Sequence, residues 1–218
     1  TLDIKICGLK TEEAVAAALE GGASHIGFIF FEKSPRHVSV AEAARLRGAA
    51  RGRALAVAVT VDADDASLDT IVAAMQPDVL QLHGRETPDR VAELRTRYGL
   101  PVMKAISIRD AEDLAAIAPY RGVTDRFLLD AKPPAGAELP GGNGIAFDWA
   151  ILASLDADVD YMLSGGINAG NIGAALQMVK PSGVDVSSGV ERAPGEKDPE
   201  KIRAFFRAVR ALDSRGAA

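Results

Sequence analysis

This chain of 218 residues has one cysteine, no excess of positive charge and no long apolar run. The single cysteine excludes an intramolecular disulfide and is typical of an intracellular protein. The net charge of −5 at pH 7 argues against general binding to nucleic acid or to anionic membranes. No apolar run approaches the ~20 residues of a membrane-spanning helix, and the first residues lack the pattern of a signal peptide. We therefore expect a cytoplasmic protein that binds neither nucleic acid nor membranes.

Metal ligands and dinucleotide-binding glycines are scarce as well. The three histidines and the one cysteine are dispersed, and the acidic residues form no cluster at the ends of predicted strands. No Gly-x-Gly-x-x-Gly sequence follows the first predicted strand. We therefore expect a protein that uses no metal and no cofactor.

Short apolar runs alternate along the chain with amphipathic segments. The run Leu55-Ala56-Val57-Ala58-Val59 is apolar at every position, which is typical of a parallel strand that is covered on both faces. The eight predicted strands are Asp3–Cys7, His25–Phe30, Leu55–Val61, Val79–His83, Val102–Ile106, Arg126–Asp130, Tyr161–Ser164 and Val184–Ser187.

Predicted helices fill the gaps between these strands. Thr11–Glu20 begins at a threonine, has glutamate in its first turn and ends at Gly21-Gly22, as a capped helix does. Eight alternations of strand and helix favour a closed barrel, since open sheets usually have fewer strands and end on edges. We predict the α/β class and one (βα)8 TIM-barrel domain over residues 1–218. The other predicted helices are Val40–Leu46, Ser67–Met75, Pro88–Tyr98, Asp110–Ile117, Asp148–Leu152, Asn171–Val179 and Pro199–Leu212.

Turns of small residues end the last two predicted strands. Glycines in such turns let backbone N–H groups approach an anion closely, and serine hydroxyls add further donors. One such turn would more often be only a tight turn, but two of them lie where barrel enzymes bind phosphate. We therefore predict a small phosphorylated substrate. The predicted phosphate-binding residues are Gly165, Gly166, Ser187, Ser188 and Gly189.

Cys7 ends the first predicted strand and Asp130 ends the sixth. In a ring of eight strands they would be three steps apart, about 135°, with the phosphate site between them. A carboxylic acid at an apolar strand end can donate a proton near neutral pH, and a thiolate can accept one. The alternatives are a buried apolar cysteine and a helix-capping aspartate. The sequence Lys132-Pro133-Pro134, which follows Asp130, is not a helix start and weakens the second alternative.

Other polar side chains belong to the same predicted face of the barrel. Arg36, in the loop after the second strand, is a candidate for binding a carboxylate or phosphate, although a solvated arginine is the common case. His83 ends the fourth strand. It is either a hydrogen-bonding group of the pocket or a histidine packed in the core. Lys5 has the same strand parity as Cys7, which predicts an ion pair with Asp185 on the adjacent eighth strand.

The order of these motifs resembles that of the phosphoribosylanthranilate isomerase family. The similarity runs from the first strand to the eighth, and the motif positions show no departure from the family pattern. The motifs are Lys5-Ile6-Cys7-Gly8, Ser34-Pro35-Arg36 within Phe30 to Val38, Gln81-Leu82-His83-Gly84, Leu129-Asp130, Gly141-Gly142-Asn143-Gly144 with Phe147-Asp148-Trp149, Ser164-Gly165-Gly166-Ile167, and Gly183 to Glu191.

The resemblance implies an Amadori rearrangement in tryptophan biosynthesis. It implies that Asp130 is the general acid that opens the furanose ring and that Cys7 is the general base that removes the C2 proton. It further implies that Arg36 binds the anthranilate carboxylate and that the two small-residue turns bind the phosphate.

Three alternatives remain at the level of the sequence. An aldolase would form a Schiff base with Lys104 on the fifth strand, and an aminoaldose isomerase would use two aspartates, where this chain has Cys7 and Asp130. A non-catalytic barrel would bind a phosphorylated ligand without turnover. The sequence is compatible with a monomer or a homodimer, and Lys132–Gly144 is the candidate for a loop that closes over the ligand.

Overall fold

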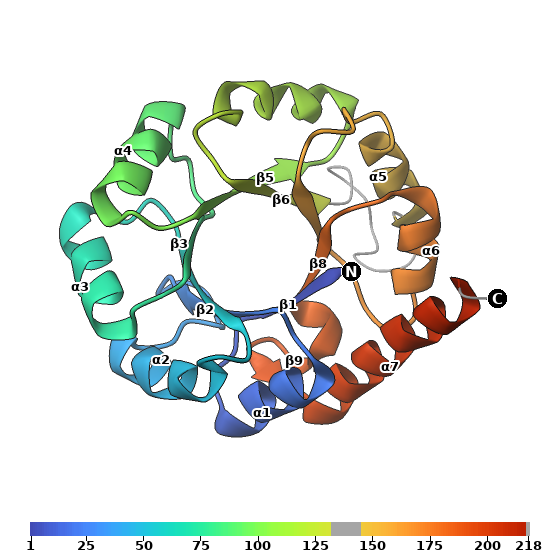
Figure 1. Cartoon of the computed structure of the whole chain (residues 1–218), viewed down its shortest axis with the longest axis horizontal. Coiled ribbons are helices and arrows are strands. Elements are labelled where there is room, and N and C mark those ends of the chain that lie inside the picture. Colours follow the sequence, from blue (N-terminus) through green and yellow to red (C-terminus); the bar gives the residue numbers. More distant parts are fainter. Residues whose placement is uncertain (132–144, 217–218) are drawn as a thin grey trace.

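The computed structural model describes residues 1–131 and 145–216, with only the backbone of residues 145–148 and 215–216. In this part of the chain eight parallel strands close into a barrel in the order β1 to β8, and β1 pairs with β8 (Figure 1). The prediction of a (βα)8 barrel is confirmed. The strands are β1 (Asp3–Cys7), β2 (His25–Phe30), β3 (Leu55–Thr60), β4 (Val79–Leu82), β5 (Val102–Ile108), β6 (Arg126–Ala131), β7 (Tyr161–Ser164) and β8 (Gly183–Val186).

Helices surround the barrel and begin and end at capping residues. The side chain of Thr11 accepts a hydrogen bond from the N–H of Ala14, and Gly22 ends the same helix with a φ of 93°. The α-helices are α1 (Glu12–Gly21), α2 (Val40–Arg47), α3 (Asp65–Met75), α4 (Pro88–Tyr98), α5 (Ile145–Leu152), α6 (Ile172–Met178) and α7 (Pro199–Gly216). The 3-10 helices are η1 (Gly48–Ala50), η2 (Ala111–Ala116), η3 (Ala118–Tyr120) and η4 (Ser188–Val190).

Two segments differ from the prediction. The helix expected over Asp110–Ile117 is replaced by the 3-10 helices η2 and η3. Asp110 caps η2 tightly by accepting from two consecutive backbone N–H groups, and Pro119 supplies no N–H for a longer helix. A hairpin of β9 (Glu191–Ala193) and β10 (Glu196–Lys197), which was not predicted, joins η4 to α7.

The strands divide their side chains between two apolar regions. Cys7, Val57, Met103 and Leu128 belong to a cluster of eight buried residues inside the barrel. Residues of the other strand parity form the larger cluster beneath the helices. The alternation fixes which strand residues reach the mouth of the barrel.

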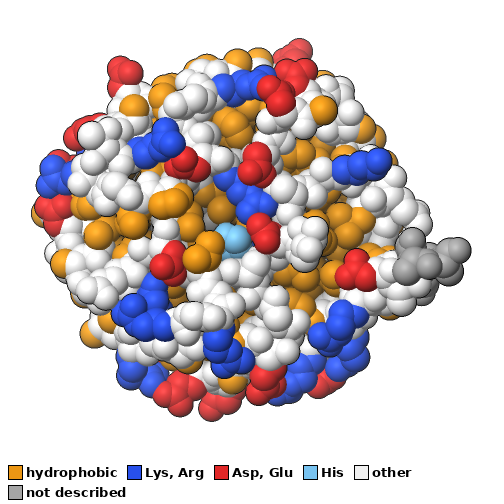
Figure 2. Space-filling model, in the orientation of Figure 1, with side chains coloured by type: hydrophobic (Ala, Val, Ile, Leu, Met, Phe, Trp, Pro, Cys, Tyr) orange, Lys and Arg blue, Asp and Glu red, His pale blue; other side chains and the backbone are white. Residues whose placement is uncertain are grey.

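The face at which the strands begin carries charged side chains of both signs, and Figures 1 and 2 show this face. On this face Arg126 binds Asp3 at 2.8 Å and Asp160 at 3.1 Å. These pairs lie at the opposite end of the strands from Cys7 and Asp130, so we assign this face to stability. No helix in the described residues is long and apolar enough to cross a membrane.

Candidate active site

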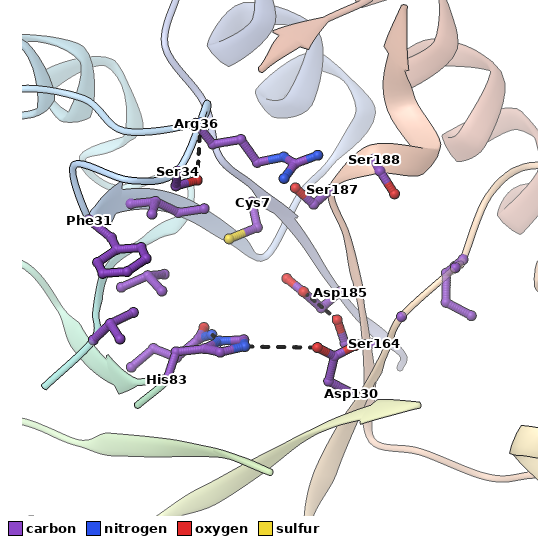
Figure 3. Close-up of a pocket in the computed structure, with 17 residues that line it drawn as sticks. Cys7, Phe31, Ser34, Arg36, His83, Asp130, Ser164, Asp185, Ser187 and Ser188 are labelled. Carbon is purple, nitrogen blue, oxygen red and sulfur yellow. Dashed lines mark hydrogen bonds and ion pairs between the residues drawn. The ribbon is translucent and has the colours of Figure 1, made fainter. Parts of the chain in front are cut away.

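A cavity of about 420 Å³ opens at the carboxyl ends of the strands. Its size suits a small-molecule ligand. Figure 3 shows Cys7, Asp130 and Arg36 facing this cavity from different strands and loops. Of the nine site residues expected from the sequence, eight line it: Cys7, Arg36, His83, Asp130, Gly165, Gly166, Ser187 and Ser188.

The ninth residue, Gly189, lies behind this lining and joins the two turns. A Cβ atom at Gly189 would lie 1.9 Å from the carbonyl oxygen of Ile167, which follows the turn after β7. Only glycine permits this approach, so Gly189 holds the turn after β8 against the turn after β7.

Cys7 is at the end of β1, and only 5% of its surface is exposed. Burial raises the pKa of the Cys7 thiol. The ammonium group of Lys5, on the same face of the strand, lowers this pKa, whereas the carboxylate of Asp185 raises it. The ionisation of the thiol therefore depends on its burial and on charged neighbours of both signs, chiefly Lys5 and Asp185.

Lys5 and Asp185 form a buried ion pair across the seam between β1 and β8. Lys5 Nζ lies 2.8 Å from Asp185 Oδ1, which confirms the pair predicted from strand parity. Ser164 Oγ donates to Asp185 Oδ2 at 2.8 Å. Burial alone would lower the pKa of Lys5, but Asp185 and Cys7 raise it, and the net shift is upward. Lys5 thus supplies a persistent positive charge beside the thiol.

Asp130 is at the end of β6, where its backbone pairs with Ser164 of β7. Its Oδ2 atom lies 3.8 Å from Nε2 of His83, which comes from the end of β4. The amide nitrogen of Gln81 lies 2.9 Å from Nδ1 of the same imidazole. With Gln81 as donor, a neutral His83 carries its proton on Nε2, the atom that faces Asp130.

The turn after β7 requires glycine for two reasons. Gly165 has a φ of 93° and Gly166 a φ of 69°, both in the left-handed region. A Cβ atom at Gly165 would also lie 2.2 Å from the carbonyl oxygen of Ala131 and 2.6 Å from Oδ1 of Asp130. The glycine turn therefore passes directly over the candidate acid.

Backbone donors face the cavity at both turns. In residues 1–131 and 145–216, the N–H groups of Gly165, Gly166 and Ser188 have no acceptor. Gly166 and Ser188 are exposed at the cavity surface. A nest of such N–H groups with nearby serine hydroxyls suits a phosphate group.

Arg36 pairs with Glu191, a residue for which the sequence predicted no role. Its Nε donates to Glu191 Oε2 at 2.9 Å and its Nη2 donates to Glu191 Oε1 at 2.6 Å. Lys197 Nζ lies 2.8 Å from Glu191 Oε2. Glu191 ends one of the sequence motifs, but its contact with Arg36 depends on the hairpin that the sequence did not predict.

Lys104 does not line the cavity. Its side chain is 2% exposed, and Nζ donates to the carbonyl oxygen of Gly84 and to Glu86 Oε1, both at 2.8 Å. It points toward the helices, because Met103 and Ala105 on either side face the barrel interior. This placement gives no support to an aldolase Schiff base at Lys104.

The segment Lys132–Gly144, with the motif at 141–144, lies outside the described residues. In the described part of the chain no group of three or more His, Cys, Asp or Glu side chains has a geometry that could hold a metal ion.

Comparisons of sequence and fold show which known proteins this chain resembles. Residues 4–208 match the family model of N-(5'-phosphoribosyl)anthranilate isomerase. The isomerase of Chelativorans sp. (strain BNC1) is 73% identical over 210 residues, which are 96% of each chain. The crystal structure of the Thermotoga maritima isomerase superposes with a TM-score of 0.86 at 30% identity, over 97% of this chain and 100% of that one.

A further solved structure shows phosphoribosylanthranilate isomerase with reduced 1-(o-carboxyphenylamino)-1-deoxyribulose 5-phosphate. It has a TM-score of 0.83 and 31% identity, and the match covers 97% of this chain and all of that chain. Family model, sequence and fold lead to one assignment. This chain belongs to the N-(5'-phosphoribosyl)anthranilate isomerase family.

Proposed function

We propose that this protein converts N-(5'-phosphoribosyl)anthranilate into 1-(o-carboxyphenylamino)-1-deoxyribulose 5-phosphate, a step of tryptophan biosynthesis. The observation that carries the proposal is the position of Cys7 and Asp130 in one cavity, on strands that flank the two small-residue turns. A sugar held by its phosphate at these turns would have a proton donor on one side and a proton acceptor on the other.

Asp130 acts first, as the general acid. It donates a proton to the furanose ring oxygen while the bond between C1 and that oxygen breaks. The lone pair of the anthranilate nitrogen forms the C1=N bond, and the product is an open-chain protonated Schiff base. Asp130 suits this role because it is half-buried at the base of the phosphate turn and faces the cavity.

Cys7 acts second, as the general base. Its thiolate removes the C2 proton, the C–H electron pair forms a C1=C2 bond, and the C=N electron pair returns to nitrogen. The resulting enolamine becomes the ketone when the C2 hydroxyl loses its proton and C1 gains one. Lys5 favours the thiolate form of Cys7 by its positive charge.

The two anionic ends of the substrate match the two ends of the cavity. We assign the phosphate to the turns at Gly165-Gly166 and Ser187-Ser188, and the anthranilate carboxylate to Arg36. His83 faces Asp130 and helps to orient it. Gly189 supports the phosphate turns from behind.

Loss of anthranilate fluorescence on freshly prepared substrate tests the function. We expect turnover by the wild type, and we expect Cys7→Ser and Asp130→Asn each to lower kcat by about 10²–10⁴. Circular dichroism checks that both variants fold.

A non-catalytic binding barrel would behave differently in the same assay. It would bind the reduced product analogue without any turnover, and neither substitution would change its behaviour. If the wild type turns over substrate and Asp130→Asn has near-normal activity, the protein is an isomerase but Asp130 is not its general acid.

A further inference from the structure

Two buried charged residues outside the cavity lining connect its two ends. Glu191 on β9 and Lys197 on β10 have side chains only 3% and 2% exposed. Their contacts reach Arg36 in the loop after β2 and Ser187 in the turn after β8. The β9–β10 hairpin therefore lies against both of the predicted anion-binding elements.

Glu191 occupies one edge of the Arg36 guanidinium. Both carboxylate oxygens are used, one by Nε and one by Nη2, so the plane of the guanidinium is fixed. No residue in the described ranges accepts a hydrogen bond from Nη1 of Arg36. Figure 3 shows the guanidinium extending over the mouth toward Ser187. The second edge of the fork is available for a ligand carboxylate.

Lys197 joins this pair to the phosphate turn. Its Nζ donates to Glu191 Oε2 at 2.8 Å, to the carbonyl oxygen of Ser187 at 3.2 Å and to the Ser187 hydroxyl at 3.3 Å. The hairpin also packs on the Arg36 loop, because a Cβ atom at Gly195 would lie 2.3 Å from the carbonyl oxygen of Pro35. The contacts fix the position of Arg36 relative to Ser187.

We propose that Glu191 and Lys197 are positioning residues that make the site selective for substrates with a carboxylate on the aromatic ring. They hold the free edge of Arg36 at a set distance from the phosphate turn, so both anionic groups of one molecule are bound together. This inference rests on the proposed function, in which Arg36 binds the anthranilate carboxylate.

An orienting role and a purely electrostatic role predict opposite effects of Glu191→Gln. Removal of a negative charge beside an anion site would by itself strengthen the binding of a carboxylate. Loss of the bidentate contact would instead release the Arg36 side chain and weaken that binding. The sign of the change therefore identifies the role.

The experiment compares kcat/KM for N-(5-phosphoribosyl)anthranilate with that for N-(5-phosphoribosyl)aniline, which lacks the carboxylate. We expect Glu191→Gln to lower the anthranilate-to-aniline ratio by about tenfold, mainly through KM for the anthranilate. We expect kcat/KM for the aniline substrate to be nearly unaffected, because this substrate has no carboxylate for Arg36 to bind. A general loss of structure would instead lower both values. An unchanged or increased ratio in a folded variant would overturn the proposal.

Two further variants make the result independent of folding. The double variant Glu191→Gln, Lys197→Met leaves no unpaired buried charge at the two positions. We expect it to lower the anthranilate-to-aniline ratio as Glu191→Gln alone does. Glu196→Gln is the matched control on the same hairpin. Its side chain is 63% exposed and pairs with Arg192, so we expect a ratio within about twofold of the wild type.

Arg36→Met separates this inference from the proposed function. If Arg36→Met leaves the ratio unchanged, the assignment of the carboxylate to Arg36 is wrong. If Arg36→Met abolishes the selectivity but both Glu191 variants retain it, the carboxylate assignment stands and the positioning role is wrong.

Discussion

The ionisation of the single cysteine depends on its burial and on charged neighbours of both signs, chiefly Lys5 and Asp185. Asp185→Asn removes the negative charge that raises the pKa of Cys7, so we expect this pKa to fall. Lys5→Met removes the positive charge that lowers it, so we expect a rise. Because Cys7 is the only cysteine in the chain, the ultraviolet absorbance of its thiolate is measured against pH as the difference from Cys7→Ser, which removes the contribution of the three tyrosines.

The same shift should be visible in catalysis. A general base must be deprotonated, so kcat/KM rises as the pH increases through the pKa of Cys7. In Asp185→Asn we expect the rising limb of the profile to move to lower pH. A limb that moves to higher pH, or that does not follow the thiolate absorbance, would be evidence against Cys7 as the base. Ser164→Ala keeps both charges and serves as the control.

Gly165 and Gly166 provide a matched pair of substitutions in the phosphate turn. Gly165→Ala places a Cβ atom 2.6 Å from Oδ1 of Asp130, so the acid or the turn must move. We expect a fall of about 10²-fold or more in kcat/KM. Gly166→Ala meets no atom within 4 Å and carries only the strain of its positive φ. Equal losses in the two variants would show that backbone strain, and not contact with Asp130, sets the effect.

For single residues, the sequence predicts a contact correctly where a strand fixes the direction of the side chain. The alternation of a strand predicted that Lys5 faces the same way as Cys7, and the pairing of β1 with β8 brings Asp185 beside it. Glu191 and Lys197 lie on strands of three and two residues. Such short strands have no periodicity to detect, so the role of these two residues was not predictable.

Among the elements, the loop after β4 is held by a buried ion pair outside the cavity. Glu86 accepts hydrogen bonds from Lys104 Nζ and from the N–H groups of Asp62 and Gly84. The Lys104 ammonium also lies 5.5 Å from the ring centre of Tyr120. Lys104 thus appears in the structure as a support for the element that carries His83.

Lys104→Met tests this structural role. It leaves the Glu86 carboxylate buried without its cation, and we expect a loss of about 3–5 kcal/mol in the free energy of unfolding, measured in urea. The folded variant should keep most of its kcat. Trapping of a ketose phosphate on Lys104 by borohydride would contradict this assignment and favour an aldolase.

The pH dependence of this support follows from Glu86. Burial alone would raise the pKa of its carboxyl group, but Lys104 and the backbone N–H groups lower it below the ordinary value. The contribution of Glu86 to stability is therefore fully present above the pKa of the unfolded chain. It is lost as the pH falls through the lower pKa of the folded protein. The difference in stability between wild type and Glu86→Gln should shrink over that range.

The elements themselves were predictable to different degrees. Strands such as β2 and β7 have the predicted bounds, because mostly apolar runs identify buried parallel strands. The segment after β5 has helical composition, but the Asp110 cap and Pro119 divide it into 3-10 helices. Local hydrogen bonds and a missing N–H thus outweighed helix propensity there.

For the whole molecule, closure brings the first and last helices together. Gly21 at the end of α1 packs on Phe206 of α7, and a Cβ atom at Gly21 would lie 2.1 Å from the Phe206 ring. We expect Gly21→Ala to destabilise the fold by about 1–3 kcal/mol, measured by thermal unfolding, with kcat unchanged. The added change Phe206→Leu should recover part of the loss. If Gly21→Ala loses no stability, then Phe206 or the two helices can shift to accommodate the added methyl group at little cost.

The closed ring of strands brings Cys7 and Asp130, which are far apart in the chain, into one cavity beside the phosphate turns. The central claim is that they act on opposite sides of one bound sugar. A crystal structure with reduced 1-(o-carboxyphenylamino)-1-deoxyribulose 5-phosphate tests this most directly. We predict the Cys7 sulfur beside C2 and the Asp130 carboxyl group beside the hydroxyl that derives from the ring oxygen. A ligand with its phosphate at the two turns but with either side chain directed away from these atoms would contradict the account.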